Sequence, residues 1–178
     1  PSKASFKASY LFWAKFEESL QKAIRMLEIG NDGLVLNRFN GKTYDEEEIE
    51  EHLSKPDDLI LYYVAAALKK GISVEKIYKL SSIDPWYIEK IKNITEIEKE
   101  LKEKNLESSL LRRAKKFGFS DRQIARAQNK EELEIRKIRK DFGIIPSVKQ
   151  IDTLAAEWPA KTNYLYLTYG GDKNDLEV

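Results

Sequence analysis

A repeat at an offset of 47 residues constrains the fold of this chain more than any other feature of its sequence. Gly71-Ile72-Ser73 recurs as Gly118-Phe119-Ser120, and Ile77 corresponds to Ile124. The remaining pairs are Leu80 with Ala127, Trp86 with Leu133, Ile88 with Ile135, and Ile91 with Ile138. Each copy has a glycine suited to end one helix and a serine suited to begin the next. We therefore predict two helix-turn-helix units that superpose and bury their isoleucine and aromatic positions, Trp86 included.

Capping residues also predict where the longer helix of each unit begins. In the first copy, Asp84 is a candidate N-cap and Pro85 stands at the first helical position. In the second copy, Lys130-Glu131-Glu132 begins the corresponding helix. The stretch 101–117 joins the two units, and its inward stripe comprises Leu106, Leu110, Leu111 and Ala114.

The first 70 residues also have a mostly helical pattern. Apolar residues at spacings of three and four predict one long amphipathic helix that ends before Gly30: Phe6, Tyr10, Trp13, Leu20, Ile24 and Leu27. Residues 31–43 are predicted to be a loop and residues 46–53 a short acidic helix. The run 59–68 is apolar around most of its circumference, so we expect a helix that is buried on several sides.

The helical pattern stops after Phe142-Gly143. Residues 144–148 are β-branched and contain a proline, which favours extended chain or an edge strand. Residues 151–158 are compatible with a short helix or with extended chain. The alternating run 164–169 predicts a strand, and we expect its partner strands to lie outside this chain.

Composition excludes several classes of function. The 31 Lys and Arg residues nearly balance the 30 Asp and Glu residues, which disfavours a dedicated nucleic-acid binder. The chain has no cysteine and a single histidine, His52, so disulfides, thiolate catalysis and Cys-ligated zinc are excluded. No run of about 18 apolar residues is present, and we expect a cytoplasmic protein without a membrane partner. Because the chain opens at Pro1 and its one methionine is Met26, we expect it to be a piece of a longer protein.

No motif in the sequence predicts an active site. The acidic stretch 45–51 lacks the glycine-punctuated spacing of a cation loop, and Gly170-Gly171 lacks the lysine and spacing of a phosphate loop. The helix-turn-helix units do leave DNA binding as an alternative, with charge supplied by basic residues between Arg112 and Lys140. Acidic residues interleave with that cluster, so solvated helix faces are the favoured interpretation. We expect no catalytic residue, no cofactor and no metal ligand.

Three stretches, in this order, resemble the central helical domain of the carbamoyl phosphate synthetase large subunit, called its oligomerisation domain. They are 16–30 (FEESLQKAIRMLEIG), 83–91 (IDPWYIEKI) and 118–125 (GFSDRQIA). The C-terminal stretches 151–158 (IDTLAAEW) and 161–169 (KTNYLYLTY) resemble the family's passage into its second ATP-grasp half. Together these motifs cover residues 16 to 169.

The resemblance implies a role by position within a larger enzyme. It implies an all-α helical oligomerisation domain at residues 1–143, with two helix-turn-helix-like repeats, and a short extended segment at 144–178 that leads toward the second ATP-grasp half. The family's catalysis belongs to its ATP-grasp halves, so the expected role is non-catalytic assembly. The implied partners are those two halves and the glutaminase small subunit, and self-association is possible.

The N-terminal segment departs from the family pattern. The family usually has a polar stretch with Gly-Glu and Gly-Arg-Thr before Phe16, whereas this chain has Tyr10, Leu11, Phe12 and Trp13. Because 6–16 is apolar almost all round, we expect burial by a second surface, with Tyr10, Phe12, Trp13 and Phe16 as interface residues. The alternative is that the 59–68 helix covers this segment within the same chain.

Overall fold

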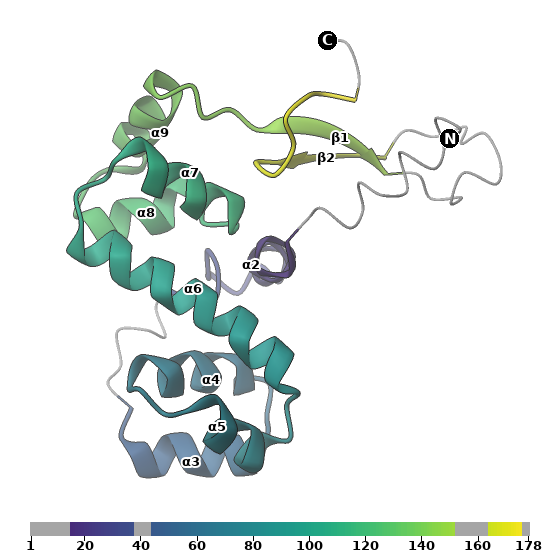
Figure 1. The fold of residues 1–178 in the computed structure, drawn as a ribbon, viewed down its shortest axis with the longest axis vertical. Coiled ribbons are helices and arrows are strands. Elements are labelled where there is room, and N and C mark those ends of the chain that lie inside the picture. Colours follow the sequence, from purple (N-terminus) through teal and green to yellow (C-terminus); the bar gives the residue numbers. More distant parts are fainter. Residues whose placement is uncertain (1–14, 38–43, 152–163, 176–178) are drawn as a thin grey trace, which may run out of the picture.

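A computed structural model describes residues 15–37, 44–151 and 164–175, and these residues form helices followed by one small sheet (Figure 1). The helices are α2 (Phe16–Met26), α3 (Glu46–Ser54), α4 (Ile60–Lys69), α5 (Val74–Ser81), α6 (Pro85–Glu103), α7 (Ser108–Lys116), α8 (Asp121–Gln128) and α9 (Glu132–Asp141). The strands are β1 (Ser147–Ile151) and β2 (Tyr164–Thr168). The predicted all-α class with a short extended C-terminal segment is confirmed.

The 47-residue repeat is a structural repeat. Gly71 and Gly118 both have φ of +84°, the left-handed conformation that favours glycine at a helix C-terminus. Ile72 N–H donates to Ala67 at 3.0 Å, and Phe119 N–H donates to Ala114 at 3.1 Å, so the same closing bond recurs 47 residues later. Ser73 and Ser120 then cap α5 and α8. Local capping chemistry therefore sets the backbone of both units, as predicted.

The apolar positions of the repeat follow the prediction with one correction. Ile77 and Ile124 are fully buried, as are Ile88 and Ile135. Trp86, however, is 52% exposed and its counterpart Leu133 is 77% exposed, so their assignment to the core is wrong. Trp86 lies two residues before Ile88, and successive helical residues diverge by about 100°, so the two side chains leave opposite sides of α6.

Helix α6 is shared by the two units. It has 19 residues, whereas its counterpart α9 has 10. One part of α6 packs against α4 and α5, and it also contacts α7 and α8. Figure 1 shows α6 crossing between a lower group (α3, α4, α5) and an upper group (α7, α8, α9), with α2 alongside.

Helix α4 has the predicted burial on several sides. Residues 62–67 are all buried, and α4 packs against α3, α5 and α6. The acidic helix predicted at 46–53 corresponds to α3, and Asp45 caps it by accepting from Glu48 N–H at 2.7 Å.

Helix α2 differs from the predicted amphipathic helix. Its buried residues are Glu17, Glu18, Gln21 and Ile24, whereas Leu27, placed in the predicted apolar seam, is exposed. Gln21, which lies outside that seam, is fully buried. The seam is confirmed at Ile24 and wrong at Leu27. The carboxylates and the amide are buried because the neighbours of α2 supply hydrogen-bond partners for them. The predicted part of this helix before Lys15 lies outside the described residues.

The two strands form an antiparallel ribbon. Ser147 pairs with Thr168 and Ile151 with Tyr164, so the expectation that the second strand pairs outside this chain is wrong. Asp175 N–H donates to Val148 at 2.9 Å and the Asn174 side chain accepts from Val148 N–H, so the outer edge of β1 is also covered. The segment 152–158 lies outside the described residues.

Candidate functional site: polar joints on the second unit

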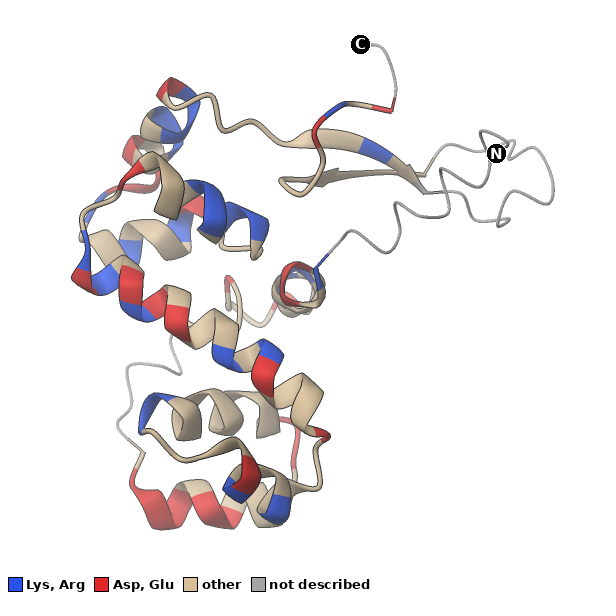
Figure 2. Cartoon of the chain, in the orientation of Figure 1, with Lys and Arg blue, Asp and Glu red and all other residues tan. Residues whose placement is uncertain are grey.

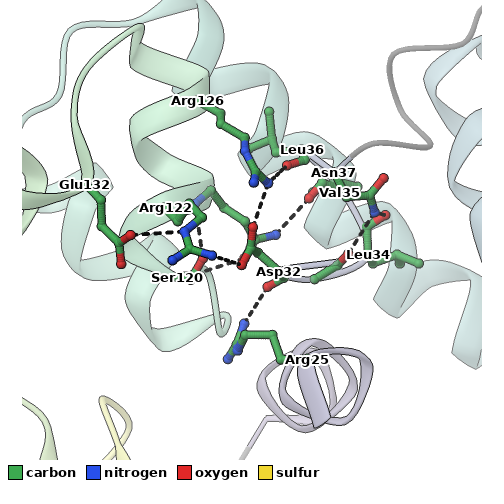
Figure 3. Close-up of polar contacts among 12 residues, drawn as sticks. Arg25, Asp32, Leu34, Val35, Leu36, Asn37, Ser120, Arg122, Arg126 and Glu132 are labelled. Carbon is green, nitrogen blue, oxygen red and sulfur yellow. Dashed lines mark hydrogen bonds and ion pairs between the residues drawn. The ribbon is translucent and has the colours of Figure 1, made fainter. Parts of the chain in front are cut away.

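The loop 31–37 joins α2 to α8 through charged contacts (Figure 3). Asp32 lies between two arginines of α8, with Arg126 at 2.7 Å and Arg122 at 3.3 Å. Arg25 of α2 donates to the Asp32 carbonyl and to the Gly118 carbonyl, both at 2.9 Å. Arg126 also donates to the Leu36 carbonyl. The loop is thus held by guanidinium groups from both sides.

Two buried glutamines form the inner layer of this joint. Gln123 Nε2 donates to Gln21 Oε1 at 2.9 Å and to the Val35 carbonyl at 2.8 Å, while its Oε1 accepts from Ser120 N–H. Gln21 in turn donates to the Phe117 carbonyl. A Cβ on Gly33 would clash with Gln21 Oε1 and Gln123 Nε2, so a side chain there would displace the two hydrogen-bonded amides.

Two buried glutamates of α2 connect it to other elements. Glu17 accepts from Asn93 of α6 at 2.8 Å. Glu18 accepts from Thr168 of β2 at 2.8 Å and pairs with Lys22 at 2.7 Å. Lys22 also donates to the Leu167 carbonyl. Helix α2 therefore contacts both α6 and the ribbon through these hydrogen bonds.

The end of the ribbon rests on a buried charged cluster. Asp121 accepts from Lys115 at 2.7 Å and from Arg139 at 3.1 Å, and the Tyr169 ring covers both cations at 4.8 and 5.5 Å. Lys115 is only 5% exposed, and this burial lowers the pKa of its ammonium to about 8, although Asp121 opposes the shift. Burial also disfavours the charged form of Tyr169, and this raises the pKa of its phenol group. Lys115 and Arg139 are thus exceptions to the prediction that this basic cluster forms solvated faces.

An aromatic cluster marks the start of α6. Phe16 makes edge-to-face contacts with Trp86 and Tyr87, with ring centroids 5.3 and 5.4 Å apart. Of the predicted interface residues, Phe16 is therefore half-buried against its own chain. Tyr10, Phe12 and Trp13 lie outside the described residues.

The remaining candidates have structural roles. His52 stacks on Tyr63 with 3.9 Å between ring centroids and contacts Asp57 at 2.9 Å, a partner that sequence did not nominate. Within the described ranges, no group of three or more His, Cys, Asp or Glu side chains could hold a metal ion. The same part of the chain contains no helix long and apolar enough to cross a membrane.

Basic and acidic residues both occur along the helices of the second unit (Figure 2). Arg122 pairs with Glu132 and Asp32, and Lys130 pairs with Glu134. The nucleic-acid alternative gains no support from this distribution, because Arg122 and Lys130 already have carboxylate partners.

Sequence reasoning missed the polar joints, although two local signals for them existed. Ser120 and Gln123 have the spacing of a capping box, which the structure contains in full. Glu17 interrupts the apolar spacing of the first helix, and it is a buried hydrogen-bond acceptor. Gln123 and Glu17 have partners in distant parts of the chain, Gln21 and Asn93, and residue spacing alone does not identify such partners.

Comparison with known proteins identifies the family. Residues 14–143 match the family model described as the carbamoyl-phosphate synthetase large chain, oligomerisation domain. The carbamoyl phosphate synthase large chain of Sulfurisphaera tokodaii is 44% identical over 163 residues, which are 91% of this chain and 16% of that protein. The large chain of Archaeoglobus fulgidus is 46% identical over 168 residues, 90% of this chain and 16% of that protein. The multifunctional protein URA2 of Saccharomyces cerevisiae is 44% identical over 166 residues, 90% of this chain and 7% of that protein. The chain belongs to the family of the oligomerisation domain of the carbamoyl phosphate synthetase large chain.

Proposed function

We propose that this domain is a non-catalytic assembly element that connects the two ATP-grasp halves of a carbamoyl phosphate synthetase large chain. In that proposal residues 1–143 form the helical domain and residues 144–178 lead toward the second half. The glutaminase subunit is a further partner of the assembled enzyme, which works in the cytoplasm and supplies arginine and pyrimidine synthesis. The chain spans about a sixth of the large chains it matches, which supports a role as one part of a larger body.

The observation that carries the proposal is that the ribbon has one face fixed to the helices and one exposed apolar face. Thr168 fixes one face of β2 to α2 by donating to Glu18. Tyr169, directly after the strand, packs its ring on Lys115. Leu165 and Leu167, on the other face of the same strand, are 50% and 56% exposed. An exposed apolar face on a two-stranded ribbon indicates a surface that another part of the assembly covers.

The test combines this chain with the two flanking segments of the large chain and follows the mass of the mixture by sedimentation. We expect association, and we expect the double change Leu165→Glu and Leu167→Glu to weaken it at least tenfold. Leu133→Glu, a change at an exposed leucine away from the ribbon, is the matched control and is expected to have no effect. Equal association of all three proteins would contradict the assignment of this face, and no association of the unaltered chain would contradict the proposed function.

A second surface concerns self-association through Tyr10, Phe12, Trp13 and Phe16. The alternative partner, α4, is already packed against α3, α5 and α6, which supports an interface outside the chain. Because Phe16 contacts Trp86 and Tyr87, the sharper variant is Phe12→Glu with Trp13→Glu, leaving Phe16 intact. We expect a folded monomer across a concentration series. An unfolded domain would instead indicate that these side chains pack internally.

A further inference from the structure

A groove of about 730 Å³ lies on the first unit, between the α4–α5 turn and α6. Its walls include Leu68 at the end of α4, Gly71 of the turn and Val74 at the start of α5. Lys92 and Thr95 of α6 form the opposite wall. Among described residues other than its two chain neighbours, none places a heavy atom within 4 Å of the position where a Cβ on Gly71 would stand. The turn is therefore open on its outer side.

The repeat shows what covers the equivalent groove of the second unit. At an offset of 47, Leu68, Val74 and Lys92 correspond to Lys115, Asp121 and Arg139. These three residues form the site on which Tyr169 packs, and its ring lies over Lys115 and Arg139. The groove of the first unit is thus the counterpart of a site that an aromatic side chain occupies in the second.

The glycine turns show the same difference. A Cβ on Gly118 would stand 2.8 Å from Glu18 Cα, because α2 packs directly on that turn. Phe119, after Gly118, is buried, whereas Ile72, after Gly71, is only half-buried. The two turns have the same backbone conformation, and only the second has its cover within the described chain.

The lining of the open groove favours an uncharged occupant. Five lysines and five glutamates line it, so its formal charge cancels. Leu68 and Val74 stand where the second unit has the charged Lys115 and Asp121, so the wall is apolar at these two positions. Lys92 keeps the cation of Arg139, and a cation beside an apolar wall suits an aromatic ring.

We propose that the groove between the α4–α5 turn and α6 is a docking site for an extended segment that presents an aromatic side chain, as the ribbon presents Tyr169 to the second unit. Its source is the part of the large chain outside residues 1–178, because no aromatic side chain of the described residues lines the groove and Tyr169 occupies the equivalent site of the second unit. This inference rests on the proposed function, in which the chain is one part of a longer large chain.

The experiment uses a large chain that carries this sequence as its oligomerisation domain. A photo-crosslinking benzoylphenylalanine replaces Leu68 in the groove wall, and the same group replaces the exposed Lys79 of α5 as the matched control. Mass spectrometry of the cross-linked peptides identifies the contacting segment. We expect the probe at 68 to capture an aromatic-containing segment outside residues 1–178, and the probe at 79 to capture none.

Hydrogen exchange gives a second readout that does not depend on the probe. We expect amides 68–75 to be at least tenfold more protected in the large chain than in the free domain, and Val74→Arg to remove that gain. Cross-links to a second copy, cross-links confined to this domain, or no change in protection would each overturn the inference. If the large chain sediments as one particle but shows no cross-link, this inference fails while the proposed function stands.

Discussion

The two helix-turn-helix units have the same capping residues but different interiors. In the first unit Leu68 and Val74 stand where the second has Lys115 and Asp121, and the exposed Lys76 stands where the second has the buried Gln123. The first unit packs its apolar faces against α3, whereas the second contacts α2, the loop 31–37 and the ribbon through polar side chains. The comparison shows that capping sets the backbone, while the neighbours of each unit decide whether its interior is apolar or polar.

The largest expected effect comes from the two capping glycines. Gly71→Ala should cost about 1 to 2 kcal/mol, because alanine is strained at a φ of +84°. Gly118→Ala should cost about 4 kcal/mol, since its Cβ would also displace the α2 backbone. Urea unfolding of the two variants measures the difference. Equal losses would show that α2 does not pack on the second turn.

The second prediction compares Gln123 with its counterpart Lys76. Gln123→Ala should cost about 3 kcal/mol, because the Gln21 and Val35 acceptors and the Ser120 donor lose their partner in a buried site. Lys76→Ala should stay within about 0.5 kcal/mol, since Lys76 makes one exposed ion pair with Glu50. Thermal unfolding monitored by circular dichroism checks both, and a small effect of Gln123→Ala would contradict the polar joint.

The third prediction concerns pH. The folded-state pKa of Lys115, about 8, lies below its ordinary value of 10.5, so the unfolded chain binds more protons between these values. The free energy of unfolding should therefore rise with pH above 8, by about 2 kcal/mol up to pH 9.5. Above pH 10 the raised pKa of Tyr169 acts in the opposite direction.

The matched variant for this pH effect is Lys115→Leu, which gives the second unit the residue of the first unit at this position. Denaturant titrations at pH 7.5 and 9.5 should show the rise in the unaltered chain and not in the variant. The same rise in both proteins would assign the effect to another group.

The smallest expected effects are at Trp86 and Leu133. Trp86→Ala should cost about 1 kcal/mol, from its contacts with Phe16 and Tyr87, well below the loss for a core tryptophan. Leu133→Ala should cost less than about 0.5 kcal/mol. Urea unfolding separates these values, and a loss above about 3 kcal/mol at Trp86 would place it in the core after all.

Local signals predicted most of the helices, and contacts distant in sequence account for most errors. The Gly-Ile-Ser and Gly-Phe-Ser turns identified both units because their capping bonds join residues close in sequence. The pairing of 147–151 with 164–168 was missed, since a strand pattern does not identify its partner. The burial of Gln21 and Glu18 was missed because their partners, Gln123 and Thr168, lie more than a hundred residues away.

Because both units pack on α6, this helix determines how cooperatively the domain unfolds. The helix is about 28 Å long, and it supplies a wall to both units, with Ile88 and Leu101 fully buried near its two ends. Repeats that meet only at an interface can melt one at a time. Here, unfolding of α6 would remove the packing surface of both units. Heating should therefore unfold both in a single cooperative transition rather than in two steps.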